Sequence, residues 1–275
     1  SEADLPLWAE RALAALDGDA NAQIQDSLVA GVPVSGSLRL QRSPQGSTVD
    51  AQVDLAGNRL TAQGRRGALA AADQWRLQWQ ASDLATLAPL GRLAGESWPA
   101  LAAYWPDAGA LSGEISASGR WPAWRTQGDV QAQGMRAGTL GLQSAQLGWS
   151  TGENADAPLS MQLRASGLAD GDRRLDALSA GITGSLRQHT LDLRLDSPAK
   201  PPAWTENLLG AAGTGTRLQV KGQGQWLASN PGSRTSGASA RPPGSWRLQA
   251  LQLQGGARDK QGGSRPWLAA EGLSA

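Results

Sequence analysis

The chain contains no cysteine and a single histidine, so several kinds of chemistry have no residues to support them. Without cysteine it can form neither a disulfide framework nor a catalytic thiolate. One histidine is too few for the His and Cys clusters that usually hold zinc. That residue, His189, lies in the segment Arg187-Gln188-His189-Thr190, which is typical of a turn. We therefore predict no metal centre and no cofactor.

Long apolar runs and an excess of one charge are also absent. No stretch reaches the roughly 18 consecutive apolar residues of a membrane-spanning helix, and no secretory signal is present. The 25 basic and 24 acidic residues are interspersed, which leaves no electrostatic footprint for nucleic acid or an anionic membrane. Because the first residue is Ser1 and not Met, we expect the sequence to be a portion cut from a longer protein.

Catalytic motifs are missing too. Among the 35 glycines none forms GxGxxG between a strand and a helix, and there is no nucleophile elbow or phosphate loop. We therefore expect a protein that is not an enzyme. A glycosidase needs only two carboxylates, so a carbohydrate-cleaving pair stays an alternative. The candidates, all at polar positions of the pattern described next, are Asp50, Asp54, Glu114, Asp129, Asp192 and Asp196.

The dominant feature of the sequence is an alternation of apolar and polar residues with a period of two. Between residues 111 and 118, Leu111 and Ile115 alternate with Glu114 and Ser116, as in a strand with one apolar and one polar face. Pro122 then breaks the run. The pattern recurs at residues 34–41, 49–55, 75–80, 159–165, 191–196 and 218–226. This repetition predicts an all-β fold, in which consecutive antiparallel strands form a long, curled, open sheet with a few short helices.

The pattern divides the chain into two parts. Residues 1–30 are predicted to form a short helical segment against the sheet edge, because Trp8, Ala12 and Leu16 share a helical face and Ile24 and Leu28 extend it. Residues 31–275 are predicted to be one continuous β-groove. We expect helical interruptions near residues 83–106 and 203–210, and a flexible Ser-, Gly- and Pro-rich loop near residues 229–244.

The apolar alternation also slips phase in two places, which predicts β-bulges. Leu248 and Ala250 fall on one face whereas Leu251 and Leu253 fall on the other. A second slip separates Leu142 from Ala145.

A sheet of a dozen strands would extend about 60 Å at roughly 4.8 Å per strand, and three short helices are too few to cover it. Its apolar face must fold onto itself or onto something outside the sequence. Small residues such as Gly36 and Gly113 would keep such a groove open. The residues predicted to line the groove are Leu38, Leu40, Val53, Leu55, Leu77, Ile115, Leu163, Leu193 and Val220.

The order of these segments resembles the TamB family of AsmA-like proteins of Gram-negative bacteria. The resemblance lies in Leu111-Ser112-Gly113-Glu114-Ile115-Ser116-Ala117-Ser118-Gly119-Arg120-Trp121-Pro122, in the strand at 128–134, in Ala157-Pro158-Leu159-Ser160-Met161-Gln162-Leu163 and in Leu84-Ala85-Thr86-Leu87-Ala88-Pro89-Leu90. It is diffuse and extends over nearly the whole chain.

This resemblance implies a periplasmic β-groove, or β-taco, whose apolar inside holds phospholipid acyl chains. The whole protein would be anchored in the inner membrane, carry phospholipid between the membranes and support outer-membrane protein assembly with a TamA-like barrel partner. The chain lacks the family's N-terminal anchor and a recognisable partner-binding C-terminal module, so it is similar to an interior portion.

Three other readings stay open. The sheet could close on itself as a dry sandwich or solenoid that acts as a scaffold or spacer. The 12 tryptophans could stack on sugars in a carbohydrate-binding protein. However, Trp75 and Trp79 are each two residues from Leu77, so they are expected on the same apolar face. Unpaired edge strands could also join copies of the chain.

Overall fold

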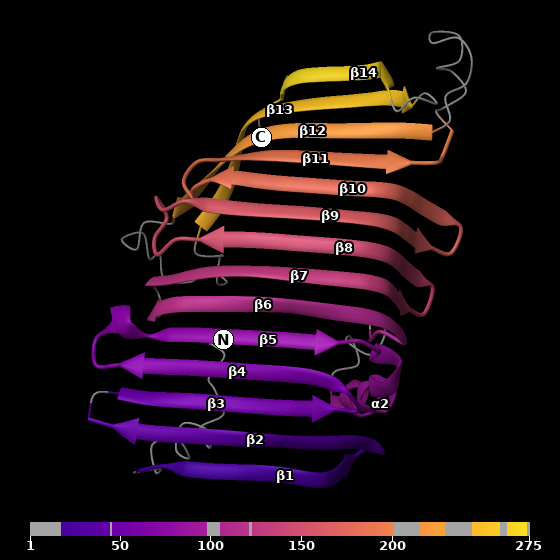
Figure 1. The fold of residues 1–275 in the computed structure, drawn as a ribbon. Coiled ribbons are helices and arrows are strands. Elements are labelled where there is room, and N and C mark those ends of the chain that lie inside the picture. The colour runs from indigo at the N-terminus through magenta and orange to yellow at the C-terminus, as the bar shows by residue number, and fades with distance from the viewer. Residues whose placement is uncertain are drawn as a thin grey trace, which may run out of the picture. The chain divides into compact units, whose positions relative to one another are not determined.

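The computed structural model describes residues 18–44, 46–97, 105–120, 123–200, 215–228, 244–258 and 263–273. The strands form an open antiparallel meander whose order is that of the chain, from β1 to β14 (Figure 1). The predicted all-β class and the long antiparallel sheet are confirmed. The chain divides into two compact units, residues 1–124 and 125–275, and each is described by itself.

Unit 1 contains strands β1 to β6 and the helical segments that join β4 to β5 and β5 to β6. The strands are β1 (Ala20–Val29), β2 (Val32–Ser43), β3 (Gly46–Leu55), β4 (Asn58–Gly67), β5 (Gln74–Ala81) and β6 (Ala108–Arg120). The helical segments are η1 (Ala70–Ala72), η2 (Leu84–Leu87) and α2 (Ala88–Ser97). No described helix is long and apolar enough to cross a membrane.

Unit 2 contains strands β7 to β14. They are β7 (Ala123–Ala137), β8 (Leu140–Thr151), β9 (Leu159–Asp170), β10 (Arg173–Gly184), β11 (His189–Ser197), β12 (Gly215–Ala228), β13 (Gly244–Arg258) and β14 (Ser264–Leu273).

Tight turns explain why consecutive strands pair. Ala30 and Gly31 have φ of 51° and 83°, and Ala56 and Gly57 have φ of 52° and 84°. Two successive residues with positive φ are the mark of the type I′ turn, whose twist matches that of a two-stranded hairpin. The second turn is held by the Asp54 carboxylate, which accepts a hydrogen bond of 2.8 Å from the Gly57 N–H. Local chemistry therefore sets the β1–β2 and β3–β4 hairpins.

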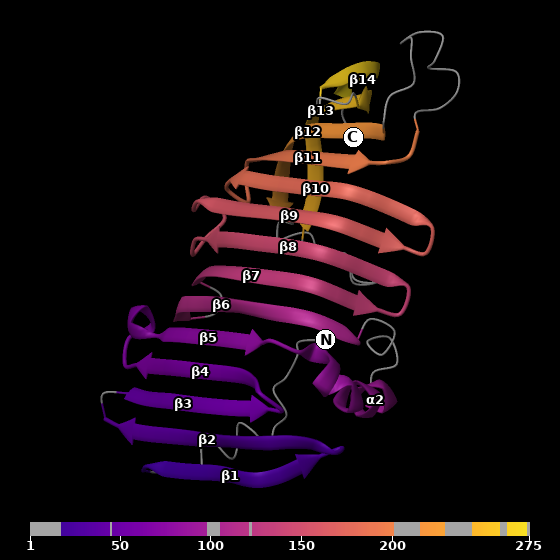
Figure 2. The same ribbon diagram turned by 45° about the vertical axis from the view of Figure 1, so that its right-hand side comes forward.

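In unit 1 a buried polar contact lies where the crossover after β5 meets the sheet, at Asn58. The Asn58 side-chain amide donates to the carbonyls of Leu55 and Asp83, at 2.9 and 3.1 Å, and to the Thr86 hydroxyl at 2.9 Å. Asn58 shares a sheet face with Leu55, its cross-strand partner, so η2 lies against that face. Figures 1 and 2 show α2 beside the same end of β3 and β4.

Few other described apolar residues are buried. In unit 1 they are Val32, Val34, Leu40 and Leu84, and in unit 2 Ala132, Ala165 and Ala257. The described strands therefore lack the thick core of a sandwich, and most of their apolar side chains stay half-buried or exposed.

Two predictions from the sequence need correction. Ile24 and Leu28 lie in strand β1 and not in a helix, because the segment pairs with β2 from Ala20↔Leu40 to Val29↔Val32. His189 is not an exposed turn residue. It begins β11 and is 7 % exposed, with its ring over Gly224, where an added Cβ would lie 2.5 Å from Nε2.

The predicted interruption at 83–106 is confirmed in part by η2 and α2. Residues 98–104 lie outside the described residues. So do the predicted helix at 203–210, residues 1–17 of the N-terminal helical segment, and residues 229–243 of the predicted loop.

The bulge predicted in β13 is confirmed, because Leu248 pairs with Gly224 while Ala250 pairs with the adjacent Gln223. The slip in β8 is different, since its register with both neighbouring strands is constant. Gln143 itself forms no ladder pair, and the constant register places it opposite Gly134 of β7 and Gly167 of β9. These glycines have φ of 59° and 62°. The alternation of side chains between the two faces therefore shifts at the same level in adjacent strands, without an extra residue in one strand.

Candidate functional site

One face of unit 1 is apolar across all of its strands, and it contains every groove residue predicted for this part of the chain. Residues directly opposite each other in antiparallel strands project to the same face, so the register defines rows of side chains. The central row is Leu38, Ala51, Ala62, Leu77 and Ile115. Its neighbours are Leu40, Val49, Gly64, Trp75 and Ala117 on one side, and Gly36, Val53, Leu60, Trp79 and Gly113 on the other. Leu55 follows in the next row, opposite Val34 and Asn58. We call this set the unit 1 apolar face.

The unit 1 apolar face is covered only in places. Leu40 is 8 % exposed, but Leu38 is 45 % and Trp75 is 41 % exposed. Gly64 lets the Trp75 ring approach the backbone of β4 closely, because a Cβ at Gly64 would lie 2.3 Å from that ring. The indole therefore lies flat over β4, so this part of the face is shallow.

Unit 2 has a corresponding face, and it includes the three groove residues predicted there. Leu163, Leu193 and Val220 fall in one row, which runs Val130, Leu147, Leu163, Ala180, Leu193, Val220, Leu253 and Ala270. A second row runs Gly128, Trp149, Met161, Ile182, Leu191, Gly222 and Leu251. A third runs Ala132, Ala145, Ala165, Leu178, Leu195, Leu218, Gly255 and Leu268. These rows are the unit 2 apolar face.

Sequence reasoning did not single out Trp149, Ile182 or Leu147 for this face, although each is half-buried on it. The signal was present as the same period of two.

The opposite faces are polar, and the carboxylates considered for catalysis lie there beside cross-strand partners. Glu114 accepts a 2.7 Å hydrogen bond from Gln78 and forms a 3.1 Å ion pair with Arg76. Asp192 lies 4.0 Å from the Lys221 amine. Such exposed cross-strand pairs stabilise a sheet modestly. Within the described ranges, no three His, Asp or Glu side chains are grouped so that they could hold a metal ion.

Each unit also has a hollow on its polar face. The one in unit 1 has a volume of about 560 Å³ and includes Gln23, Arg39, Asp50 and Gln52 in its lining. The one in unit 2 is about 320 Å³ and includes Gln131, Gln146 and Arg164. Most of the lining side chains are amides, hydroxyls and charged groups, which suit contact with water. Leu38 and Ala51 in unit 1, and Ala132, Ala145 and Ala165 in unit 2, also contribute to the linings.

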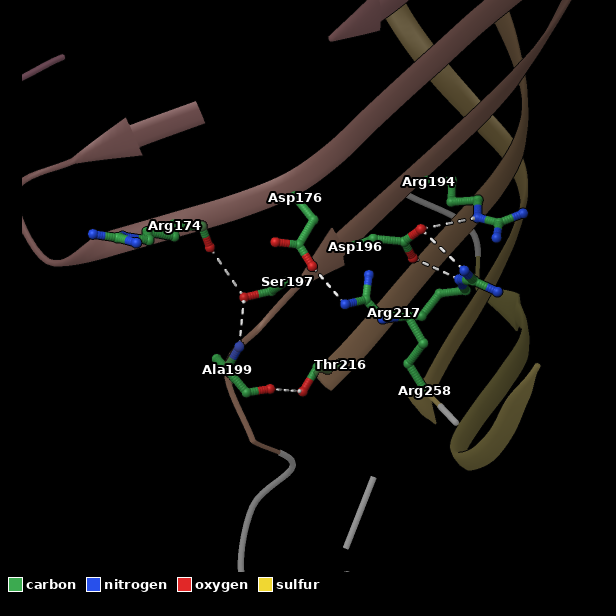
Figure 3. Close-up of polar contacts among 9 residues, drawn as sticks. All are labelled: Arg174, Asp176, Arg194, Asp196, Ser197, Ala199, Thr216, Arg217 and Arg258. Carbon is green, nitrogen blue, oxygen red and sulfur yellow. Dashed lines mark hydrogen bonds and ion pairs between the residues drawn. The ribbon is translucent and has the colours of Figure 1, made fainter. Parts of the chain in front are cut away.

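A buried carboxylate links the strand ends of unit 2. Asp196 is 8 % exposed and accepts hydrogen bonds from Arg217 Nε and Nη2 at 2.5 and 3.0 Å. The bonds from Arg217 lower the pKa of Asp196, against the raising effect of burial. Figure 3 shows this pair beside a second one, in which Arg258 of β13 reaches Asp176 of β10. Together they tie β10, β11, β12 and β13, and we interpret them as structural.

Unit 1 has an equivalent clamp. Asp73, which is 3 % exposed, accepts from Arg120 Nε and Nη2 at 2.8 and 2.9 Å and from the Gly67 N–H at 2.9 Å. The hydrogen bonds from Arg120 are the main reason why the pKa of Asp73 is lowered. This clamp joins the end of β4 to the end of β6.

Trp75 and Trp79 do not form the platform that the carbohydrate alternative requires. Trp75 and Trp79 lie on the unit 1 apolar face with Leu77, as their alternation predicts, while Glu114 and Asp50 lie on the opposite face. An aromatic platform beside paired carboxylates is therefore not formed by these residues.

Comparison with known proteins adds no assignment: no family model, no curated protein and no solved structure matches the chain.

Proposed function

We propose that the chain is a non-enzymatic, periplasmic segment that shields phospholipid acyl chains. In this proposal each apolar face lines part of an open groove, in a longer protein anchored in the inner membrane. That protein moves phospholipid between the inner and outer membranes and supports outer-membrane protein assembly with a TamA-like barrel. The single observation that carries the proposal is the uninterrupted apolar row from Val130 to Ala270 on half-covered strands.

Leaving such a face in water is costly. Burial of apolar surface is worth about 25 cal/mol per Å², and soluble proteins seldom expose apolar patches larger than a few hundred Å². Acyl chains would cover the face without specific polar contacts, and the three rows of the unit 2 apolar face contain no charged side chain. A ligand that needed directional recognition would require polar groups that these rows do not provide.

The dimensions of the unit 2 apolar face suit a lipid tail. Along β9 it extends from Met161 through Leu163 to Ala165, which at about 3.4 Å per residue is roughly 14 Å. One leaflet of a bilayer is about 15 Å thick, or half of the hydrocarbon core. A tail lying along the strands would therefore extend over all three rows of the face.

The competing proposal is a structural module in which protein, not lipid, closes the faces. Facing sheets of such a module would lie about 10 Å apart and would exclude lipid. Self-association through the edges stays a prediction. Two features oppose such edge pairing: the bulge between Ile24 and Ser27 in β1, and Pro266 in β14. A bulge or a proline in an edge strand hinders hydrogen bonding to another strand.

The test is native mass spectrometry of the purified chain, followed by organic extraction and lipid analysis. Leu163→Asp puts a charge in the central row, and the matched control Gln162→Asp puts the same charge on the adjacent polar position of β9. We expect phospholipid to co-purify with the wild type and the control, and to be lost from Leu163→Asp. A lipid-free, stable, monomeric wild type would favour the structural module.

A further inference from the structure

Two described indole N–H groups are buried without an acceptor, and one of them lies on the unit 1 apolar face. Nε1 of Trp79 and Nε1 of Trp105 have no hydrogen-bond partner in the part of the chain that the structure describes. A buried donor left unpaired carries its full desolvation cost, so native proteins rarely retain one without a reason. Trp79 therefore needs an acceptor that its neighbours on the face do not supply.

The neighbours explain why. Trp79 lies opposite Leu60 of β4 and Gly113 of β6, and its row continues through Val53 and Gly36. None of these side chains has an oxygen or nitrogen atom. Among the described residues, the side chains of this row therefore supply no acceptor, and an acceptor on the face would reach Nε1 after a shift of the indole or of the atoms that cover it.

The position of Trp79 is also distinctive. Its row is adjacent to the row that contains Leu55 and Asn58, where η2 covers the sheet. In the other direction lie the rows of Leu77 and Trp75, the latter 41 % exposed. Trp79 thus stands at the boundary between a covered end, where Asn58 bonds to η2, and an open apolar surface. Tryptophan favours such boundaries, because its ring is apolar while its N–H requires a polar partner.

Building on the proposed function, we propose that Trp79 donates its indole N–H to the ester carbonyl of a bound glycerolipid. The acyl chain then runs over the rows of Leu77 and Trp75. An ester carbonyl is the acceptor that lies next to the apolar chain in such a lipid, so one molecule satisfies both the donor and the face. An ether-linked lipid with the same head group and chains covers the face but presents no carbonyl.

The experiment compares short-chain diacyl phosphatidylethanolamine with its dialkyl ether counterpart, each titrated against the full chain by calorimetry. We expect the wild type to bind the ester lipid about fivefold more tightly, as one neutral hydrogen bond would give. Trp79→Phe keeps the apolar ring and should abolish this preference. Its affinity for the ether lipid should stay unchanged, which also verifies its fold.

Two control variants separate the donor from the loss of an indole. Trp105→Phe removes the other unpaired N–H, whose ring packs against Gly91 of α2 and not on a strand row. Trp75→Phe changes the same face about 13 Å along β5, four residues away. Both should keep the ester preference.

The outcomes distinguish this inference from the proposed function. Equal affinity of the wild type for both lipids, or a preference that survives in Trp79→Phe, would overturn the role of Trp79 and leave acyl-chain binding standing. Failure of either lipid to bind any variant would overturn the proposed function, and the role of Trp79 with it.

Discussion

The clamp in unit 1 gives a prediction that tests the structure without reference to function. Asp73→Asn keeps the shape of the side chain but removes its charge, and it replaces the oxygen that accepts from Arg120 Nε by an NH₂ group that cannot accept. Because Asp73 is 3 % exposed, the lost bonds are not replaced by water. We expect unit 1 to lose about 1–3 kcal/mol of stability at neutral pH.

The pKa direction adds a pH dependence. Folding lowers the pKa of Asp73 below its ordinary value of 3.8, so its stabilising contribution is complete above that pH. The contribution is lost as the pH falls through the lower pKa of the folded state. Asp73→Asn should therefore be less stable than the wild type at neutral pH, and the difference should shrink in strong acid.

The assay is urea unfolding followed by tryptophan fluorescence at several pH values, together with hydrogen exchange of the Gly67 amide. That amide donates to Asp73 Oδ1, which asparagine also provides, so its protection reports how far the weaker clamp loosens the end of β4. The control is Asp156→Asn, which breaks the exposed pair of Asp156 and Arg187 at 3.0 Å and should cost less than about 0.5 kcal/mol. Equal stability of Asp73→Asn and the wild type at neutral pH would refute the clamp.

The remaining predictions concern the faces and the turns. Leu163→Asp should lose co-purified phospholipid while Gln162→Asp retains it, measured by mass spectrometry of extracts; equal lipid in both would contradict the proposal. Trp79→Phe should abolish the ester preference measured by calorimetry. Gly224→Val should destabilise unit 2 by about 1–3 kcal/mol in urea, because its Cβ would lie 2.5 Å from His189 Nε2; an unchanged midpoint would show that the ring moves freely. Ala56 has φ of 52° in a type I′ turn, a conformation that asparagine adopts more readily than alanine. Ala56→Asn should therefore stabilise unit 1 by about 0.5–1 kcal/mol and raise its thermal midpoint. A lower midpoint would argue against that turn.

Much of the architecture follows from local patterns. Alternation predicted the strands that contain Leu38, Leu77, Ile115 and Leu193, and it also predicted the face on which each residue lies. Side-chain direction in a strand depends only on the parity of the residue number until a bulge intervenes. The bulge near Leu248 was visible for the same reason.

Local patterns failed where two periods fit the same residues. Ile24 and Leu28 are four residues apart, which suits a helical face and equally suits alternate positions of a strand. The segment is a strand because pairing with β2 provides hydrogen bonds for the backbone groups of residues 20–29. His189 was misjudged in the same way, since its burial over Gly224 depends on the register of β11 with β12.

By itself, the sequence determined that this is an all-β chain with one apolar and one polar side to its strands, because both properties depend on neighbours two residues apart. Only the tertiary structure decided which residues share a row, so that Leu163, Leu193 and Val220 are aligned across strands distant in the chain. It also decided that Asp73 meets Arg120 and that Trp79 stands at the edge of the covered end. These facts depend on strand register, which is set by hydrogen bonds between segments that no local pattern can specify.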